Sequence, residues 1–153
     1  VRHLKASLEV AAELGDRMLE GIMLGHLGRV YERQERLDQA RVSLESSVEI
    51  LRSIASRRSE GISLGALGSV LAKLGMIDEA RRSFASGAEL LQQTNDPVEL
   101  GKLLCAYACA EVVAGNRDVA KKLVGDAQDL ADHLRSHEGS ALSAEIAALR
   151  ERI

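Results

Sequence analysis

The chain has little of several residue types whose abundance would mark a function. Its 153 residues include two cysteines, one proline and three aromatic side chains. Two cysteines are too few for a disulfide framework, and three rings are too few for a platform on which nucleic-acid bases stack. The sequence contains no run of about 18 apolar residues, the length needed for a membrane-spanning helix. The net charge is -3, whereas nucleic-acid binders typically have an excess of basic residues. We therefore expect no nucleic-acid partner, no membrane partner and a cytoplasmic location.

The bulk composition is that of an ordinary globular protein, with 46% hydrophobic and 28% charged residues. This length suits one compact domain or a short array of repeats. The sequence starts at Val1, without a methionine and without a signal pattern of charged and then apolar residues. We therefore expect it to be a piece of a longer polypeptide.

A repeat with a period of 40 residues dominates the sequence. The segment that begins at Gly21 recurs from Gly61, and a third, weaker copy begins at Gly101. Identical pairs in the first two copies include Gly21/Gly61, Leu24/Leu64, Gly28/Gly68, Asp38/Asp78 and Ala40/Ala80. Repeats of this length indicate stacked supersecondary units. We predict a single repeat domain over 1–153, made of a half repeat (1–20), three full repeats (21–60, 61–100 and 101–140) and a C-terminal capping helix (141–153).

Each copy contains two helical patterns joined by a short turn. In 17–34 and in 37–54, apolar residues recur at spacings of three and four, the period of one helix face. Good N-cap residues precede each first helix: Asp16, Ser56, Asp96 and Ser136. Behind Asp96, Pro97 suits the first helical position and Glu99 predicts a capping box. Gly75 and Gly115 mark turns, so the copies are predicted to be helix-turn-helix hairpins.

Two glycines inside predicted helices need a packing reason, because each costs about 1 kcal/mol relative to alanine. They are Gly28 and Gly68, and Ala108 is their counterpart in the third copy. The second helices offer alanine at the expected crossing: Ala40, Ala80 and Ala120. We interpret this pattern as small residues that let two helices approach closely.

The order of these residues resembles the signature of tetratricopeptide repeats (TPRs). The first copy reads Leu24-x2-Leu27-Gly28-x2-Tyr31 and then Ala40-x3-Leu44. The departures are a period longer than the usual 34 residues and a leucine in place of the usual tryptophan. The resemblance covers essentially the whole chain and implies an all-α fold: a right-handed superhelical array of stacked antiparallel helix hairpins, a TPR-like solenoid of about seven helices.

No enzyme motif is apparent, so we expect no catalysis, no cofactor and no metal. Cys105 and Cys109 are four residues apart and share a helix face, where they could form a redox pair or half of a metal site. They stand where the second copy has Gly65 and Ser69, which favours a packing role. His133 and His137 also share a helix face and could be part of a metal site, but they stand near a predicted helix end with no obvious third ligand. Two basic pairs, Arg81/Arg82 and Lys121/Lys122, are predicted to be a solvated outer face.

The TPR resemblance implies a concave groove, lined by the first helices, that binds extended or helical peptide segments. Carried onto this sequence, the candidate groove residues are His26, Arg29, Arg33, Ser69, Lys73, Lys102, Cys105 and Cys109. The basic members could recognise an acidic stretch or could be ordinary surface charges. Chaperone-binding TPRs clamp a carboxylate with a lysine and asparagine set, which this groove does not reproduce.

The resemblance therefore implies a non-catalytic protein–protein interaction module, a scaffold or signalling component, that binds a peptide or partner domain. The alternative is a ligand-sensing or autoregulatory segment of a multidomain bacterial signalling protein. Residues 1–15 are predicted to be an unpartnered second helix that presents Leu4, Leu8 and Ala11 as a sticky edge, through which copies could associate. At the other end, Leu142, Ile146 and Leu149 are predicted to form the stripe of a capping helix.

Overall fold

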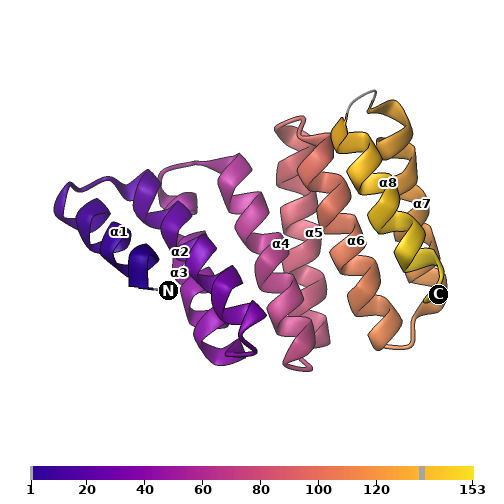
Figure 1. Ribbon diagram of the computed structural model, residues 1–153, viewed down its shortest axis with the longest axis horizontal. Coiled ribbons are helices and arrows are strands. Elements are labelled where there is room, and N and C mark those ends of the chain that lie inside the picture. The colour runs from indigo at the N-terminus through magenta and orange to yellow at the C-terminus, as the bar shows by residue number, and fades with distance from the viewer. Residues whose placement is uncertain (1, 135–136) are drawn as a thin grey trace.

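The computed structural model describes residues 2–134 and 137–153, without the side chains of Lys5 and residues 137–140, and this part contains only helices and short connections. The helices are α1 (Arg2–Glu13), α2 (Arg17–Arg33), α3 (Leu37–Ser53), α4 (Arg57–Lys73), α5 (Ile77–Gln93), α6 (Pro97–Val113), α7 (Arg117–His133) and α8 (His137–Arg150). Figure 1 shows the helix pairs following one another along the molecule, with α1 and α8 at opposite ends. The predicted all-α array of stacked hairpins is confirmed. The described ranges hold eight helices instead of about seven, because one helix flanks the three hairpins on each side.

The hairpins are α2–α3, α4–α5 and α6–α7, and we call α2, α4, α6 and α8 the first helices. All six helices of the hairpins have 17 residues and are joined by short turns. Gly75 and Gly115 occupy their turns with φ of 80° and 83°, as predicted. Glu35, Ala55 and Asn95 also have positive φ. Such a conformation costs a residue with a side chain about 1–2 kcal/mol, and no glycine marks these three turns in the sequence.

The helix caps agree with the prediction at two of the three positions that the structure describes. Asp16 accepts a hydrogen bond from the Leu19 amide at 2.9 Å, and Asp96 accepts one from the Glu99 amide at 3.1 Å. Ser56 makes no side-chain cap, because its hydroxyl donates to the sulfur of Met18 instead. The predicted capping box at Asp96 is not formed, since its own amide donates to a carbonyl of α5. Ser136 lies outside the described residues.

The glycines at the helix crossings are confirmed as points of close approach, and at Gly28 the expected Ala40 is one neighbour, with its carbonyl oxygen 3.1 Å from the missing Cβ. A methyl group on Gly28 would lie 2.5 Å from Cγ of Leu44, and one on Gly68 would lie 2.9 Å from the Phe84 ring. The second helix therefore fills the space with a large side chain, not with alanine alone. Leu44 and Phe84 are completely buried in the main core, which runs through the first two hairpins into α6.

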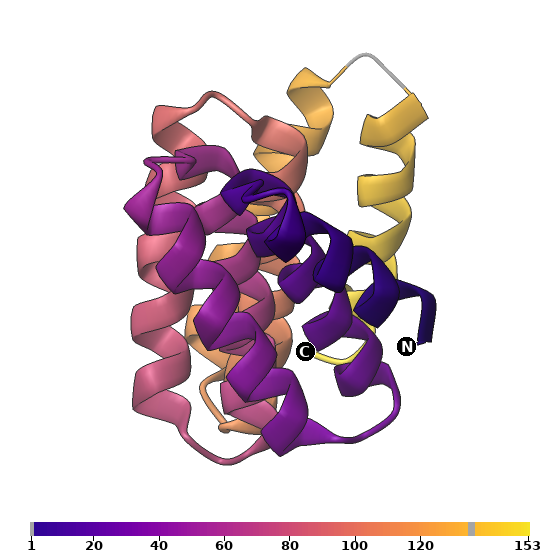
Figure 2. The ribbon, with the colours of Figure 1, turned by 90° about the vertical axis from the view of Figure 1, so that its left-hand side faces the viewer.

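The N-terminal end of the array differs from the prediction in one respect. Ala11 is completely buried and Leu4 packs against the main core, so the predicted sticky edge is wrong in its residues. The reason is that α1 turns this face toward α2. The large exposed apolar residues at this end are Val10 of α1 and Leu14 just after it, which are 51% and 74% exposed. Figure 2, which looks along the row from the α1 end, shows α1 lying across the helices behind it.

At the C-terminal end, the predicted stripe of α8 is confirmed. Leu142, Ile146 and Leu149 are at most 3% exposed and pack in a second core with α6 and α7. This helix therefore covers the apolar side of the last hairpin, as a capping helix should.

Candidate functional site

The first helices line a chain of adjoining cavities, which we call the groove. One cavity of about 290 Å³ lies between α2 and α4, and one of about 380 Å³ lies between α4, α6 and the C-terminal residues. A smaller cavity joins them, because it shares Arg29 and Ile62 with the first and Ser69 and Ala106 with the second. A further cavity over α2 shares Arg29 as well. In Figure 1 the first helices face the viewer, so the groove lies on this side.

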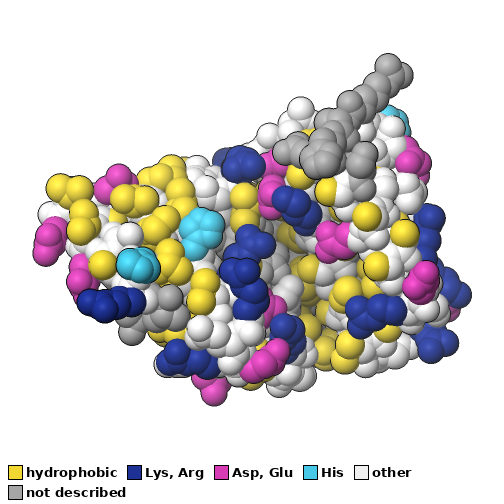
Figure 3. Space-filling view, viewed as in Figure 1, with side chains coloured by type: hydrophobic (Ala, Val, Ile, Leu, Met, Phe, Trp, Pro, Cys, Tyr) yellow, Lys and Arg dark blue, Asp and Glu magenta, His cyan; other side chains and the backbone are white. Residues whose placement is uncertain are grey.

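The groove is cationic although the chain is acidic. Two glutamates and six Lys or Arg residues line it. The six cations are Arg29, Arg33, Arg58, Lys73, Lys102 and Arg152. Among the side chains that the structure describes, 12 of the 18 Lys and Arg residues but 20 of the 22 Asp and Glu residues lie outside the groove. Figure 3 shows the basic side chains gathered along the middle of this face.

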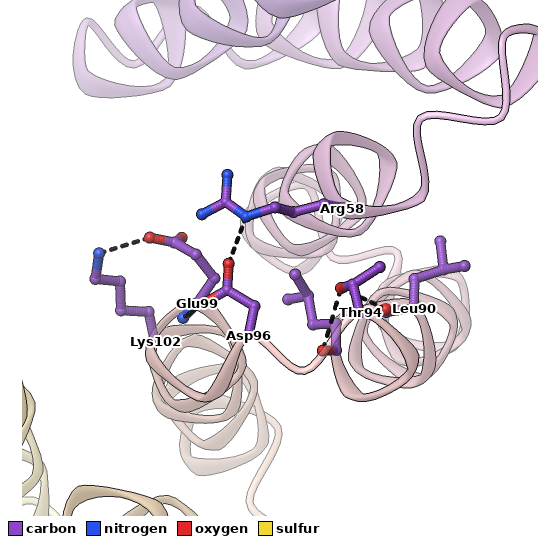
Figure 4. A network of polar contacts seen from close by, with 7 residues as sticks. Arg58, Leu90, Thr94, Asp96, Glu99 and Lys102 are labelled. Carbon is purple, nitrogen blue, oxygen red and sulfur yellow. Dashed lines mark hydrogen bonds and ion pairs between the residues drawn. The ribbon is translucent and has the colours of Figure 1, made fainter. Parts of the chain in front are cut away.

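Ion pairs occupy three of the six cations. Lys102 Nζ lies 2.7 Å from Oε1 of Glu99. Arg58 Nε lies 2.6 Å from Oδ2 of Asp96, which ties α4 to the N-terminus of α6. Figure 4 shows these two pairs next to each other. The third pair is Lys73–Glu32, at 3.1 Å, and it joins α4 to α2.

Arg29 is the cation at the centre of the groove. It lines three of the four cavities and its side chain is exposed. In the described part of the chain its guanidinium has no hydrogen-bond or ion-pair partner, whereas Glu32, three residues later, is paired with Lys73. His26 and Arg33, on the same helix, likewise have no side-chain partner there. The structure thus brings together three of the predicted residues on α2, with their polar groups unoccupied.

The groove becomes apolar toward the C-terminal end. Its last cavity is lined largely by small or aliphatic side chains: Ala72, Ala106, Cys109, Ala110 and Val113. Val113 is 76% exposed and, together with the small side chains beside it, adds to the apolar lining of this cavity. Arg152 lies at the rim, with Nη1 at 3.9 Å from Sγ of Cys109. Of the predicted residues, Ser69, Lys73 and Cys109 line this cavity.

Cys105 does not line the groove, and this part of the prediction is wrong. It is 1% exposed and belongs to the core formed by α6, α7 and α8. Burial raises the pKa of its thiol to about 12. Both cysteines are free thiols. The packing role that the alignment with Gly65 favours is the outcome for Cys105, and the packing of α8 against α6 produces it.

Arg81 is a second correction, because it was expected on a solvated outer face. Its Nε and Nη2 donate to the two carboxylate oxygens of Glu111 at 2.7 and 2.9 Å, and Asn116 donates to the same carboxylate at 2.7 Å. Glu111 is 2% exposed. The hydrogen bond from Arg81 lowers the pKa of this glutamate, although burial opposes the shift. The available signal was that Glu111 aligns with Tyr31 and Leu71, so a carboxylate at a core position required a cation.

The described residues include no group of three His, Cys, Asp or Glu side chains that could hold a metal ion. The ring of His133 contacts the Asp129 carbonyl, and the side chain of His137 lies outside the described residues. Among the described helices, none combines the length and the apolar character that a membrane span requires. A scan against models of known protein families finds no match, and a search of curated proteins finds no relative. The helical repeat array is therefore established by the structure itself.

Proposed function

We propose that this chain is a non-catalytic interaction module of the TPR type, which binds an acidic segment of a partner protein in the groove. The observation that carries the proposal is the charge difference between the cationic groove and the acidic remainder of the chain. Such a distribution favours encounter with carboxylate-bearing segments and disfavours basic ones.

Arg29 is the residue we assign to the partner's carboxylate. A guanidinium can donate two parallel hydrogen bonds to a carboxylate, and an unoccupied one at the centre of the groove loses no existing partner when it does so. One exposed pair contributes only about 0.2–1 kcal/mol, so useful affinity needs several such contacts together with apolar burial. The small side chains around Val113 provide a surface for that burial.

The proposal is tested by selecting 12-residue peptides from a random display library on the purified chain. We expect the bound peptides to be enriched in Asp and Glu. The same selection is repeated with Arg29→Glu and with Arg82→Glu, which makes the same charge change at an exposed residue of α5 outside the groove. We expect Arg29→Glu to lose the acidic peptides and Arg82→Glu to keep them. Equal loss in both variants would show that only the overall charge matters, and the groove assignment would fail.

The alternative function is recognition of a small ligand by a regulatory segment. The cavity of about 290 Å³ between α2 and α4 favours it, because this is near the lower end of the volume of small-molecule sites. A thermal-shift screen of small carboxylic acids separates the two functions. Stabilisation by a small acid, with loss of the effect in Arg29→Glu, would favour the sensor over the peptide-binding module.

A further inference from the structure

One arrangement in the groove calls for an explanation beyond simple charge. Arg29 and Glu32 are three residues apart on α2, a spacing at which opposite charges on a helix attract each other. Both residues line the same two cavities. The Glu32 carboxylate nevertheless pairs with Lys73 of the neighbouring hairpin, at 3.1 Å, and its side chain is 17% exposed.

We propose that Lys73 is a positioning residue for Arg29. By holding the Glu32 carboxylate at the junction of α2 and α4, Lys73 keeps the Arg29 guanidinium available for a carboxylate of the partner. This inference rests on the proposed function, because it assumes that an acidic segment binds at Arg29.

Lys73 prevents a competition for Arg29 that comes from the same helix. A carboxylate on the same helix has a high effective concentration at Arg29 and would compete with any carboxylate from solution. Glu99, the other groove glutamate, shares two cavities with Arg29 and is occupied by Lys102 at 2.7 Å. Both internal carboxylates that could neutralise Arg29 are therefore held by lysines.

A purely structural role for the Lys73–Glu32 pair makes a different prediction. If the pair only fastened α2 to α4, removing either partner would open the groove and weaken binding to the same extent. In the positioning role, the two removals have opposite effects. Loss of Lys73 releases Glu32 to occupy Arg29, whereas loss of the Glu32 charge removes the competitor.

The test is a double-mutant cycle with a fluorescein-labelled hexaglutamate peptide, measured by fluorescence anisotropy at low ionic strength. We expect Lys73→Met to weaken binding about fivefold, the size of one exposed ion pair. Glu32→Gln should bind as well as the wild type or better. The double variant Lys73→Met/Glu32→Gln should recover most of the lost affinity. Lys122→Met, an exposed lysine of α7 outside the groove, is the matched control and should change affinity less than about twofold.

Two results would overturn the inference. If Lys73→Met weakens binding by the same factor in the wild-type and the Glu32→Gln backgrounds, Lys73 is a direct contact of the peptide and not a positioning residue. Equal weakening by both single changes would make the pair a structural fastening. Arg29→Ala distinguishes these failures from failure of the proposed function. If Arg29→Ala weakens binding while the cycle fails, only the positioning role is wrong; if Arg29→Ala has no effect, both proposals fall. Circular dichroism of each variant verifies that the helices remain folded.

Discussion

The close approach of two helices at Gly68 leads to a prediction about stability. In Gly68→Ala, the new Cβ would lie 2.9 Å from three atoms of the Phe84 ring. The ring cannot move aside easily, because it is completely buried and stacks on Tyr107 with ring centroids 4.8 Å apart. Overpacking of this kind costs about 1–3 kcal/mol, and the better helix propensity of alanine returns about 1 kcal/mol. We expect a net loss of up to about 2 kcal/mol in the free energy of unfolding.

A second glycine provides the matched control. Gly125, inside α7, has no heavy atom within 4 Å of its missing Cβ. Gly125→Ala therefore gains helix propensity without a clash and should stabilise the protein by up to about 1 kcal/mol. The same chemical change thus has opposite signs at two helical positions, and packing alone makes the difference.

The three copies of the repeat support this argument from within the sequence. As the first-helix residue grows from glycine to alanine, the aligned second-helix residue shrinks. The pairs are Gly28/Leu44, Gly68/Phe84 and Ala108/Val124. The double variant Gly68→Ala/Phe84→Val recreates the third pair, so it should be more stable than the sum of its single changes predicts.

Urea denaturation followed by circular dichroism measures these differences, and thermal melts should shift by about 2–4 °C per kcal/mol. If Gly68→Ala were as stable as Gly125→Ala, the Phe84 ring would have to yield at no cost. The packing argument for the helical glycines would then be refuted.

Three further predictions concern other parts of the fold. Glu111→Gln should destabilise the protein at neutral pH. Because the pKa of this buried glutamate is lowered from its ordinary 4.5, the difference in stability from the wild type should shrink as the pH falls below that value. Urea midpoints over a pH series measure this difference, and a difference that stays constant with pH would contradict the prediction. At pH 8, a thiol reagent should modify Cys109 quickly in the folded protein and Cys105 only after urea is added, because Cys105 is buried and burial raises the pKa of its thiol to about 12. Equal reaction rates of the two thiols would argue against the packing of α8 on α6. Self-association through the N-terminal end stays a prediction. Leu14→Glu should reduce it in sedimentation experiments, whereas Val42→Glu, at an exposed valine elsewhere on the surface, should not. A wild type that stays monomeric at high concentration would refute the prediction.

The sequence by itself determined the number and kind of structural units. Spacings of three and four residues define which face of each helix is apolar, and their recurrence every 40 residues places the hairpins in register. The candidate groove residues came from the TPR resemblance, and of these His26, Arg29, Arg33, Ser69, Lys73 and Cys109 line the cavities along the first helices. Lys102 lies there as well. These outcomes depend on the geometry of single helices, which is local.

Only the tertiary structure decided which side chains meet across hairpins. Glu32 pairs with Lys73, 41 positions away, and Arg81 pairs with Glu111, 30 positions away. Helix periodicity says toward which side such residues point, but the partner that each one reaches depends on how neighbouring hairpins are offset and tilted. Cys105 shows the same limit, since the packing of one more helix turned an expected groove residue into a core residue.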